Sequence, residues 1–157
     1  MIIRRKPSAN FTRPADTTAY ASGDLVANST TVGSVVPLTF SPCTKGAGRS
    51  AQIRRVLISK TGTSITNTTV RVHLFNVLPT VATNGDNGAI TIATGAAGYL
   101  GQADVVINQA FNDGAAGQTT TEINFNSLTL YGLLEARGAW TPASAEVITV
   151  TLESCED

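Results

Sequence analysis

The sequence alternates apolar and polar residues with a period of two in several separate stretches, and this feature constrains the fold more than any other. In Val70–Leu74 the apolar side chains point to one side, while Arg71 and His73 point to the other. The segments Glu122–Asn126 and Glu146–Leu152 alternate in the same way. Successive side chains of a strand point to opposite faces, so this is the pattern of half-buried β-strands. Long helical periodicity is missing, and the chain is therefore predicted to be all-β.

Further strands are predicted where Val, Ile, Thr and aromatic residues are concentrated, because these side chains fit a pleated surface. Turn sequences rich in Gly and Asn separate the stretches, since both residues accept a positive φ at low cost. Two segments are ambiguous: Ala82–Gly101 fits a long loop or a weak strand pair, and Leu133–Ala139 fits one helical turn. The additional predicted strands lie near Thr18–Asn28, Ser34–Phe40, Gln52–Lys60, Asp104–Ala110 and Leu128–Glu135.

About eight short antiparallel strands at regular spacing are typical of a β-sandwich. The chain has 157 residues, which suits a single domain. The jelly roll, with two facing antiparallel sheets, uses this number of strands and this length best. An immunoglobulin-like sandwich is the alternative, but its Cys-Trp-Cys spacing is absent. Residues 1–16 are basic, contain proline and alternate poorly, so we expect an extended basic N-terminal arm followed by a jelly-roll-like β-sandwich over residues 17–157.

The overall charge excludes some partners. Lys and Arg number 11, Asp and Glu number 11, and the formal net charge is zero. This balance argues against a protein that coats nucleic acid or lies on an anionic membrane. The apolar runs are short, so no transmembrane segment is expected. Pro7 follows the N-terminal charges where a secretory signal would place an apolar stretch, so no signal peptide is expected. Cys43 and Cys155 are therefore expected to be free thiols, with a bridge between them as the alternative.

The charge is unevenly distributed along the chain. Up to Arg71 there are ten basic residues against two acidic ones (+8), and after it one basic residue against nine acidic ones (−8). Two interpretations are open. The asymmetry could create complementary faces that favour association with copies of the chain or with a charged partner. Alternatively, strands from the two halves interleave and the charges mix.

The residues suggest no catalytic or metal-binding constellation. His73 is the only histidine, and no nucleophile elbow accompanies it, so we interpret it as a surface residue of a strand. One histidine and two distant cysteines do not make a zinc site. Asn84–Gly88 resembles a calcium loop but lacks the acidic residue that would close it, and a hydrogen-bonded turn fits as well. We expect no enzyme, cofactor or metal; scattered acids that could in principle form a glycosidase pair are Asp104, Glu122, Glu135 and Glu146.

The basic arm supplies the candidate partner-binding residues Arg4, Arg5, Lys6, Phe11 and Arg13. Clustered Arg and Lys are typical of phosphate binding. An aromatic residue with an arginine is also typical of protein interfaces. We favour a protein partner over nucleic acid, because the rest of the chain carries no excess positive charge.

Several strings of the sequence resemble a family of tailed-bacteriophage virion proteins, over most of the chain from Phe11 to Leu152. The resemblance implies a head decoration or cement protein with a jelly-roll-like fold, bound outside the shell of the major capsid protein. The family offers no catalytic residues to transfer. The strings that carry the resemblance are Phe11–Tyr20, Ser22–Ser29, Ile53–Lys60, Arg71–Phe75, Gly85–Ala89, Tyr99–Gly101 and Leu130–Pro142.

We therefore expect a virion protein on the capsid exterior, assembled in the bacterial host cytoplasm, that acts as a homo-oligomer, with a trimer favoured over a dimer. Avidity would multiply weak contacts in such an assembly. The alternative is a phage tail or fibre-associated, or carbohydrate-binding, β-sandwich module. Its candidate sugar platforms would be Trp140, Tyr20, Tyr99 and Tyr131, although core packing explains these aromatic residues better.

Overall fold

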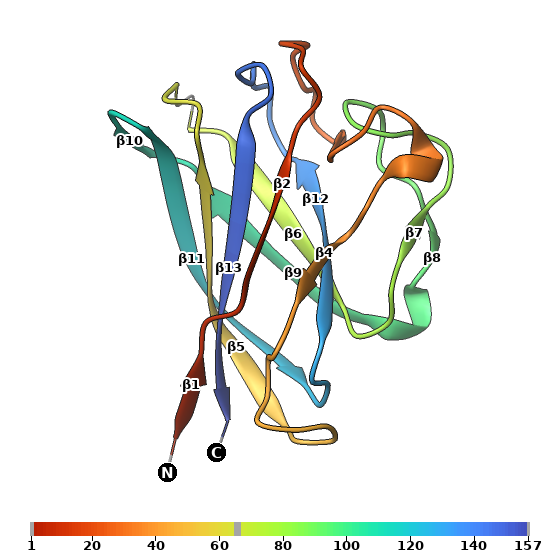
Figure 1. The fold of residues 1–157 in the computed structure, drawn as a ribbon, viewed down its shortest axis with the longest axis vertical. Helices are drawn as coiled ribbons and strands as arrows, with labels where there is room; N and C mark the ends of the chain where they lie inside the picture. Colours follow the sequence, from red (N-terminus) through yellow and green to blue (C-terminus); the bar gives the residue numbers. More distant parts are fainter. Residues whose placement is uncertain (1, 65–66, 157) are drawn as a thin grey trace.

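The fold is a sandwich of two antiparallel β-sheets, and the computed structural model describes residues 2–64 and 67–156 of it (Figure 1). The six-stranded sheet has the order β1-β13-β5-β11-β10, and β2 also pairs with β13. The N-terminal strand β1 and the end of β13 lie side by side, so both chain ends are at the same end of the sandwich. The strands of this sheet are β1 (Ile3–Arg5), β2 (Ser8–Thr12), β5 (Ala51–Lys60), β10 (Gln109–Phe111), β11 (Gly114–Phe125) and β13 (Val147–Glu156).

The five-stranded sheet has the order β3-β12-β6-β9, and β4 also pairs with β12. Its strands are β3 (Leu25–Val26), β4 (Leu38–Phe40), β6 (Thr69–Phe75), β9 (Tyr99–Val106) and β12 (Leu130–Ala136). A separate two-stranded hairpin joins β6 to β9 and consists of β7 (Thr80–Val81) and β8 (Ile92–Thr94). The two 3-10 helices, η1 (Val32–Ser34) and η2 (Ala96–Gly98), are single turns, and within the described ranges no helix has the length and apolarity needed to cross a membrane.

The strand order is that of a jelly roll. The order β2-β13-β5-β11 in one sheet faces β4-β12-β6-β9 in the other, and the chain crosses between the sheets at nearly every connection. This arrangement contains two Greek keys built from eight strand positions. It confirms the all-β, jelly-roll-like sandwich predicted from the alternation.

The core between the sheets is built from the inward positions of the alternating strands. In β13 every second residue is buried, including Ile148, Val150 and Leu152. The facing strand β6 buries Val72 and Leu74 in the same way. Full burial of such a side chain contributes about 1.5–3 kcal/mol each, so this regular pattern accounts for a closed, apolar interior.

Most predicted strands are present, but two segments differ from their predictions. Of the predicted strand near Thr18–Asn28, only Leu25–Val26 forms a strand, while Tyr20 and Asp24 form isolated bridges with Trp140 and Ala89 on either side of a turn. The predicted helical turn at Leu133–Ala139 is wrong, since β12 continues through Ala136. The ambiguous segment Ala82–Gly101 contains β8, η2 and the start of β9, and β8 pairs with β7, which lies just before the segment, so the segment holds one strand of a pair and not both.

A second apolar cluster explains why the connection between β6 and β9 folds back on the sheet. Phe75, Leu133 and Leu25 are buried on the outer side of the five-stranded sheet. Val81 and Ile90 of the connection pack against them. The connection therefore covers part of this outer face.

The N-terminal segment contains two strands of the six-stranded sheet, Ile3–Arg5 and Ser8–Thr12, so this part of the segment belongs to the sandwich and does not project as a separate arm. β1 pairs with residues Ser154–Glu156 of β13, and β2 pairs with Val147–Thr151. Pro7 separates the two short strands, because proline lacks the N–H that a continuous ladder needs. The physical reason for docking is that β13 would otherwise expose an unpaired edge.

Candidate partner-binding site

The outer face of the six-stranded sheet carries a shallow, positively charged groove of about 730 Å³. Four cationic side chains from two separate segments meet there: Arg4 and Lys6 from the N-terminus, and Arg54 and Arg55 from β5. We call this feature the basic groove. Its lining residues are Arg4, Lys6, Arg54, Arg55, Thr120, Thr121, Glu122 and Glu153.

Two β-bulges at one level of the sheet place consecutive arginines on the same outer face. Against β13, Arg55 pairs with Glu153 and Ile53 with Ser154, which leaves Arg54 as an extra residue. Ile53 and Val56 on either side are fully buried, while both arginines point outward. A bulge interrupts the strict alternation of a strand and redirects a side chain in this way.

The neighbouring strand β11 is irregular at the same level. Arg55 is opposite Thr120 and Ile53 is opposite Ile123, so Thr121 and Glu122 together face Arg54. The second bulge brings the Glu122 carboxylate to the groove, where Arg54 Nη1 donates to its Oε1 at 3.0 Å. The local register therefore determines which charges line the groove.

Glu153 lies at the centre of the cations. Arg55 Nη2 donates to its Oε2 at 2.9 Å, and Arg4 Nη1 reaches its Oε1 at 3.5 Å. Lys6 Nζ is 3.8 Å from Oε2, beyond hydrogen-bond distance. Four cations thus face the two carboxylates of Glu122 and Glu153, and the groove has a formal excess of two positive charges.

The cations of the groove are accessible to solvent. The exposed fraction of the side chain is 67% for Arg4, 61% for Lys6, 50% for Arg54 and 38% for Arg55. An ion pair with two exposed partners, such as Arg54–Glu122, contributes little to stability, with a median of about 0–1 kcal/mol. The groove is therefore available to a partner at small cost to the fold.

The structure separates the five residues predicted to bind a partner. Arg4 and Lys6 lie in the basic groove. Arg5 alternates to the other side of β1, is half-buried, and pairs in register with buried Ser154. Phe11 is half-buried and packs against the core. Arg13 is buried, and its prediction as a surface contact is wrong for this structure.

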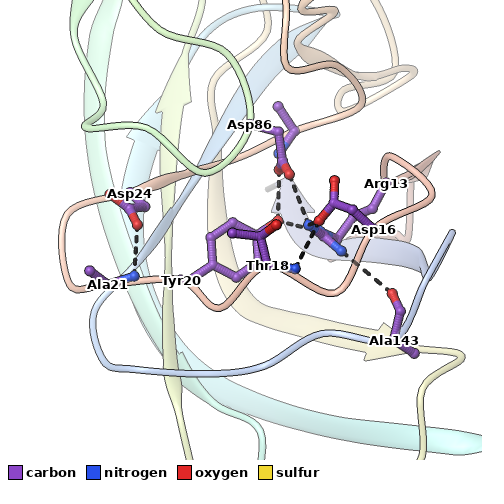
Figure 2. A network of polar contacts seen from close by, with 9 residues as sticks. Arg13, Asp16, Thr18, Tyr20, Ala21, Asp24, Asp86 and Ala143 are labelled. Carbon is purple, nitrogen blue, oxygen red and sulfur yellow. Dashed lines mark hydrogen bonds and ion pairs between the residues drawn. The ribbon is translucent and has the colours of Figure 1, made fainter.

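Arg13 is buried because it is the centre of a polar network inside the molecule (Figure 2). Its Nη2 donates to Asp86 Oδ2 at 2.8 Å, and its Nε hydrogen-bonds to the hydroxyl of Tyr20. The Tyr20 hydroxyl donates to Asp86 Oδ1 at 2.7 Å, and the backbone N–H of Ala27 donates to the same oxygen at 2.7 Å. Burial raises the pKa of Tyr20, and the charge of Asp86 raises it further.

This network also decides between the two interpretations of Asn84–Gly88. The Asp86 carboxylate is occupied by three donors from the protein itself, in agreement with the hydrogen-bonded turn. Across residues 2–64 and 67–156, no three His, Cys, Asp or Glu side chains gather in a way that could hold a metal ion.

The charge asymmetry of the sequence is resolved by pairing between the two halves. The jelly roll interleaves early and late strands, so basic residues up to Arg71 meet acidic residues beyond it. Most charges therefore mix as in the second interpretation, while the basic groove keeps a local excess of two positive charges. The pairs are Arg4–Glu153, Lys6–Glu153, Arg13–Asp86, Arg49–Glu156, Arg54–Glu122, Arg55–Glu153, Lys60–Glu146 and Arg71–Asp104.

His73 lies on the outer side of the five-stranded sheet, as predicted, within a polar cluster. Its Nε2 is 2.7 Å from Glu135 Oε2, and its Nδ1 is 3.2 Å from the Tyr99 hydroxyl. Burial opposes ionisation of Glu135, but hydrogen bonds from His73 and Arg137 outweigh it and lower the pKa of the carboxyl. His73, Glu135 and Tyr99 thus form a polar network on the outer face of this sheet.

The aromatic residues considered as sugar platforms divide into two groups. Tyr20 and Trp140 are buried and stack with ring centroids 4.8 Å apart, in agreement with core packing. Tyr131 is half-buried against the second apolar cluster. Tyr99 is 42% exposed beside His73. Of these four residues, only Tyr99 is more than one-third exposed.

Both cysteines are free thiols, as expected. Cys43 is buried, and its burial raises the pKa of the thiol to about 11. Cys155 is half-buried near the end of β13.

The sequence analysis did not identify Arg54 and Arg55 as part of a binding site, although the sequence contains a pattern that indicates it. In Ile53-Arg54-Arg55-Val56, two consecutive charged residues interrupt an otherwise regular alternation. Such an interruption indicates a bulge. Glu153 and Glu122 gave no separate signal, because isolated acids on strands are normally solvated.

Comparison with known proteins does not identify a family. No family model matches the sequence, and no curated protein matches it. Among solved structures, the decameric BFDV capsid protein is 11% identical over 100% of this chain and 99% of that chain, with a TM-score of 0.39. The capsid of Helicobacter pylori bacteriophage KHP30 is 8% identical over 99% and 93%, with a TM-score of 0.30. A carbohydrate-binding module specific for non-crystalline cellulose, CBM28, is 14% identical over 90% and 69%, with a TM-score of 0.35. Similarities at these TM-scores do not distinguish capsid proteins from carbohydrate-binding modules.

Proposed function

We propose that the chain is a non-enzymatic decoration or cement protein of a bacteriophage head, which binds the outside of the major capsid protein shell and stabilises it. The observation that carries this proposal is the basic groove, an accessible and charged sheet face on a sandwich with a closed core. Such a face suits contact with a large partner. The protein would be located on the capsid exterior of virions assembled in the bacterial cytoplasm.

Two further points support this function. The jelly roll is an architecture of viral capsid and lectin domains, so it suits a role in binding or assembly. The sequence from Phe11 to Leu152 resembles tailed-bacteriophage virion proteins. Of the resembling strings, Ile53–Lys60 contains the arginine pair of the basic groove.

We also propose that the protein acts as a homo-oligomer, with a trimer favoured over a dimer. Exposed apolar side chains outside the basic groove supply surface for self-association: Val77, Leu78, Ile92 and Phe111 are all more than one-third exposed. An oligomer would add avidity to each modest capsid contact. Light scattering of the purified protein measures the oligomeric state, and a monomer at all concentrations would contradict this part.

Co-sedimentation with phage heads that lack the protein tests the main proposal. Wild type is expected to pellet with the heads. The double variant Arg54→Gln/Arg55→Gln is expected to lose at least about tenfold in apparent affinity, since hydrogen bonds to charged groups contribute about 1.5–3 kcal/mol. Lys45→Gln/Arg49→Gln is the matched control, because it removes the same charge outside the groove. Wild-type protein that stays in the supernatant would refute the proposal.

A carbohydrate-binding or tail-fibre role is the second candidate, and Tyr99 favours it. The exposed ring lies beside His73, and its hydroxyl donates to Gln102 Oε1 at 3.3 Å. An aromatic face next to polar groups is a common arrangement for ligand recognition. Glycan-array binding that is lost in Tyr99→Ala, together with no binding to heads, would favour this candidate.

A further inference from the structure

The cations of the basic groove have unused hydrogen-bonding capacity. An arginine has five N–H donors and a lysine three. Arg4 makes one contact in the groove, at 3.5 Å, and Lys6 is 3.8 Å from its nearest carboxylate. Among the residues that the structure describes, Arg54 uses Nη1 alone, for Gln52 at 2.6 Å and Glu122 at 3.0 Å. The two carboxylates of the groove therefore leave most donors free.

We propose that the basic groove binds an acidic, carboxylate-bearing segment of the partner protein. This inference rests on the proposed function, because it names the chemistry of the partner at the same site. The partner carboxylates bind the free donors of Arg4, Lys6 and Arg54, and the groove's excess of two positive charges is neutralised. Planar guanidinium groups match carboxylates through paired, nearly parallel hydrogen bonds.

Charge arrangement favours an acidic protein segment over a nucleic acid. A nucleic-acid surface typically extends over many phosphates, and its affinity grows with the number of cations engaged. Here the excess is confined to one groove, and the formal net charge of the chain is zero. A continuous phosphate backbone would also pass close to the carboxylates of Glu153 and Glu122, which would repel it. A peptide can place its carboxylates beside the cations alone.

Substitution of Glu122 is expected to strengthen binding, opposite to the loss of binding expected for the arginine variants. Its side chain is 70% exposed and pairs with Arg54, so it competes with any incoming carboxylate for the same donor. Glu122→Gln keeps the size of the side chain and removes the competing charge. Removing a like charge from a binding site strengthens attraction of an anion. Loss of the folded groove would separate its cations and weaken binding, so a gain reports on the removed charge.

The experiment measures fluorescence anisotropy of a labelled Glu-rich peptide at low salt. A Gln-rich peptide of equal length and a single-stranded oligothymidylate are the comparison probes. Wild type is expected to bind the acidic peptide at least about tenfold more tightly than the neutral one, and Arg54→Gln/Arg55→Gln to abolish this preference. Glu122→Gln is expected to tighten binding of the acidic peptide about threefold. The control Lys45→Gln/Arg49→Gln is expected to change this binding less than about twofold. Salt at 0.5 M is expected to abolish the binding.

The outcomes separate this inference from the proposed function. Equal binding of the acidic and neutral peptides, or no gain in Glu122→Gln, would overturn the inference. Tighter binding of the oligothymidylate would replace it with nucleic-acid recognition. If the peptide fails to bind while wild-type protein still pellets with heads, the inference fails and the proposed function stands. If the acidic peptide binds to the protein but phage heads do not, the proposed function fails and the groove remains a binding site for an acidic segment.

Discussion

Arg13 and Asp86 form an ion pair at 2.8 Å inside the molecule, with both side chains fully buried, although 73 positions separate them in the sequence. Breaking a buried pair leaves an uncompensated charge, at a cost of about 3–5 kcal/mol. Arg13→Met is therefore expected to lower the free energy of unfolding by this amount in urea denaturation. The exposed control Arg54→Gln is expected to change it by less than about 1 kcal/mol. Equal midpoints for the two variants would show that the network does not stabilise the fold.

Acid is expected to weaken the ion pair between Arg71 and Asp104. Hydrogen bonds from Arg71, at 2.7 and 2.9 Å, hold the pKa of the Asp104 carboxyl below its ordinary value. Because the folded-state pKa is the lower one, this stabilisation is fully present above the unfolded value of about 4. It is lost as the pH falls through the folded-state pKa. The difference in unfolding free energy between wild type and Asp104→Asn should therefore shrink from pH 7 to pH 3, and a constant difference would contradict the assignment.

Deletion of residues 1–12 is expected to destabilise the whole sandwich, because it removes β1 and β2 from the edge of β13. Phe11 also leaves the core surface. A lower melting temperature and aggregation in light scattering are the expected results, since the new edge is unpaired. The double variant Arg4→Gln/Lys6→Gln removes the exposed charges and should leave the melting temperature nearly unchanged. Loss of capsid binding in this variant alone would implicate charge, whereas loss in the deletion could reflect unfolding.

Gly117 is required where two strands approach closely at the edge of the sandwich. A Cβ atom added there would lie 1.9 Å from the backbone oxygen of Val106. Gly117→Ala is expected to cost about 1–3 kcal/mol of unfolding free energy, because the backbone must shift. Gly33→Ala is the control, since nothing lies within 4 Å of its added Cβ. Similar stability of the two variants would contradict the close approach.

The thiols are expected to react at different rates with a disulfide reagent at pH 8. Burial raises the pKa of Cys43 to about 11, so little thiolate forms and the reagent has no access. Cys155 is only half-buried and should react first. We expect one rapidly reacting thiol in the native protein and two in urea. Two equally fast thiols in the native protein would contradict burial of Cys43.

Strands with regular alternation could be predicted from the sequence because they obey a local rule. β5, β6 and β13 bury every second residue over most of their lengths, and each was predicted. β1 and β2 were not, because their inward positions carry few apolar residues beyond Ala9 and Phe11. Their place depends on long-range pairing with β13, which no local pattern indicates.

The candidate site could be predicted only in part for the same reason. Arg4 and Lys6 were identified from a local cluster of charge. Their neighbours Arg54 and Arg55 come from a distant strand, and the double bulge that exposes them depends on β11 and β13. Arg13 was misplaced, because a charged residue is exposed by default and its partner Asp86 is remote in sequence.

A cryo-electron microscopy map of the decorated phage head tests the central claim most directly. The map should show this jelly roll on the outside of the shell, with Arg4, Lys6, Arg54 and Arg55 against acidic side chains of the major capsid protein. A map in which the jelly roll is absent from the shell, or in which these four side chains face solvent, would contradict the account.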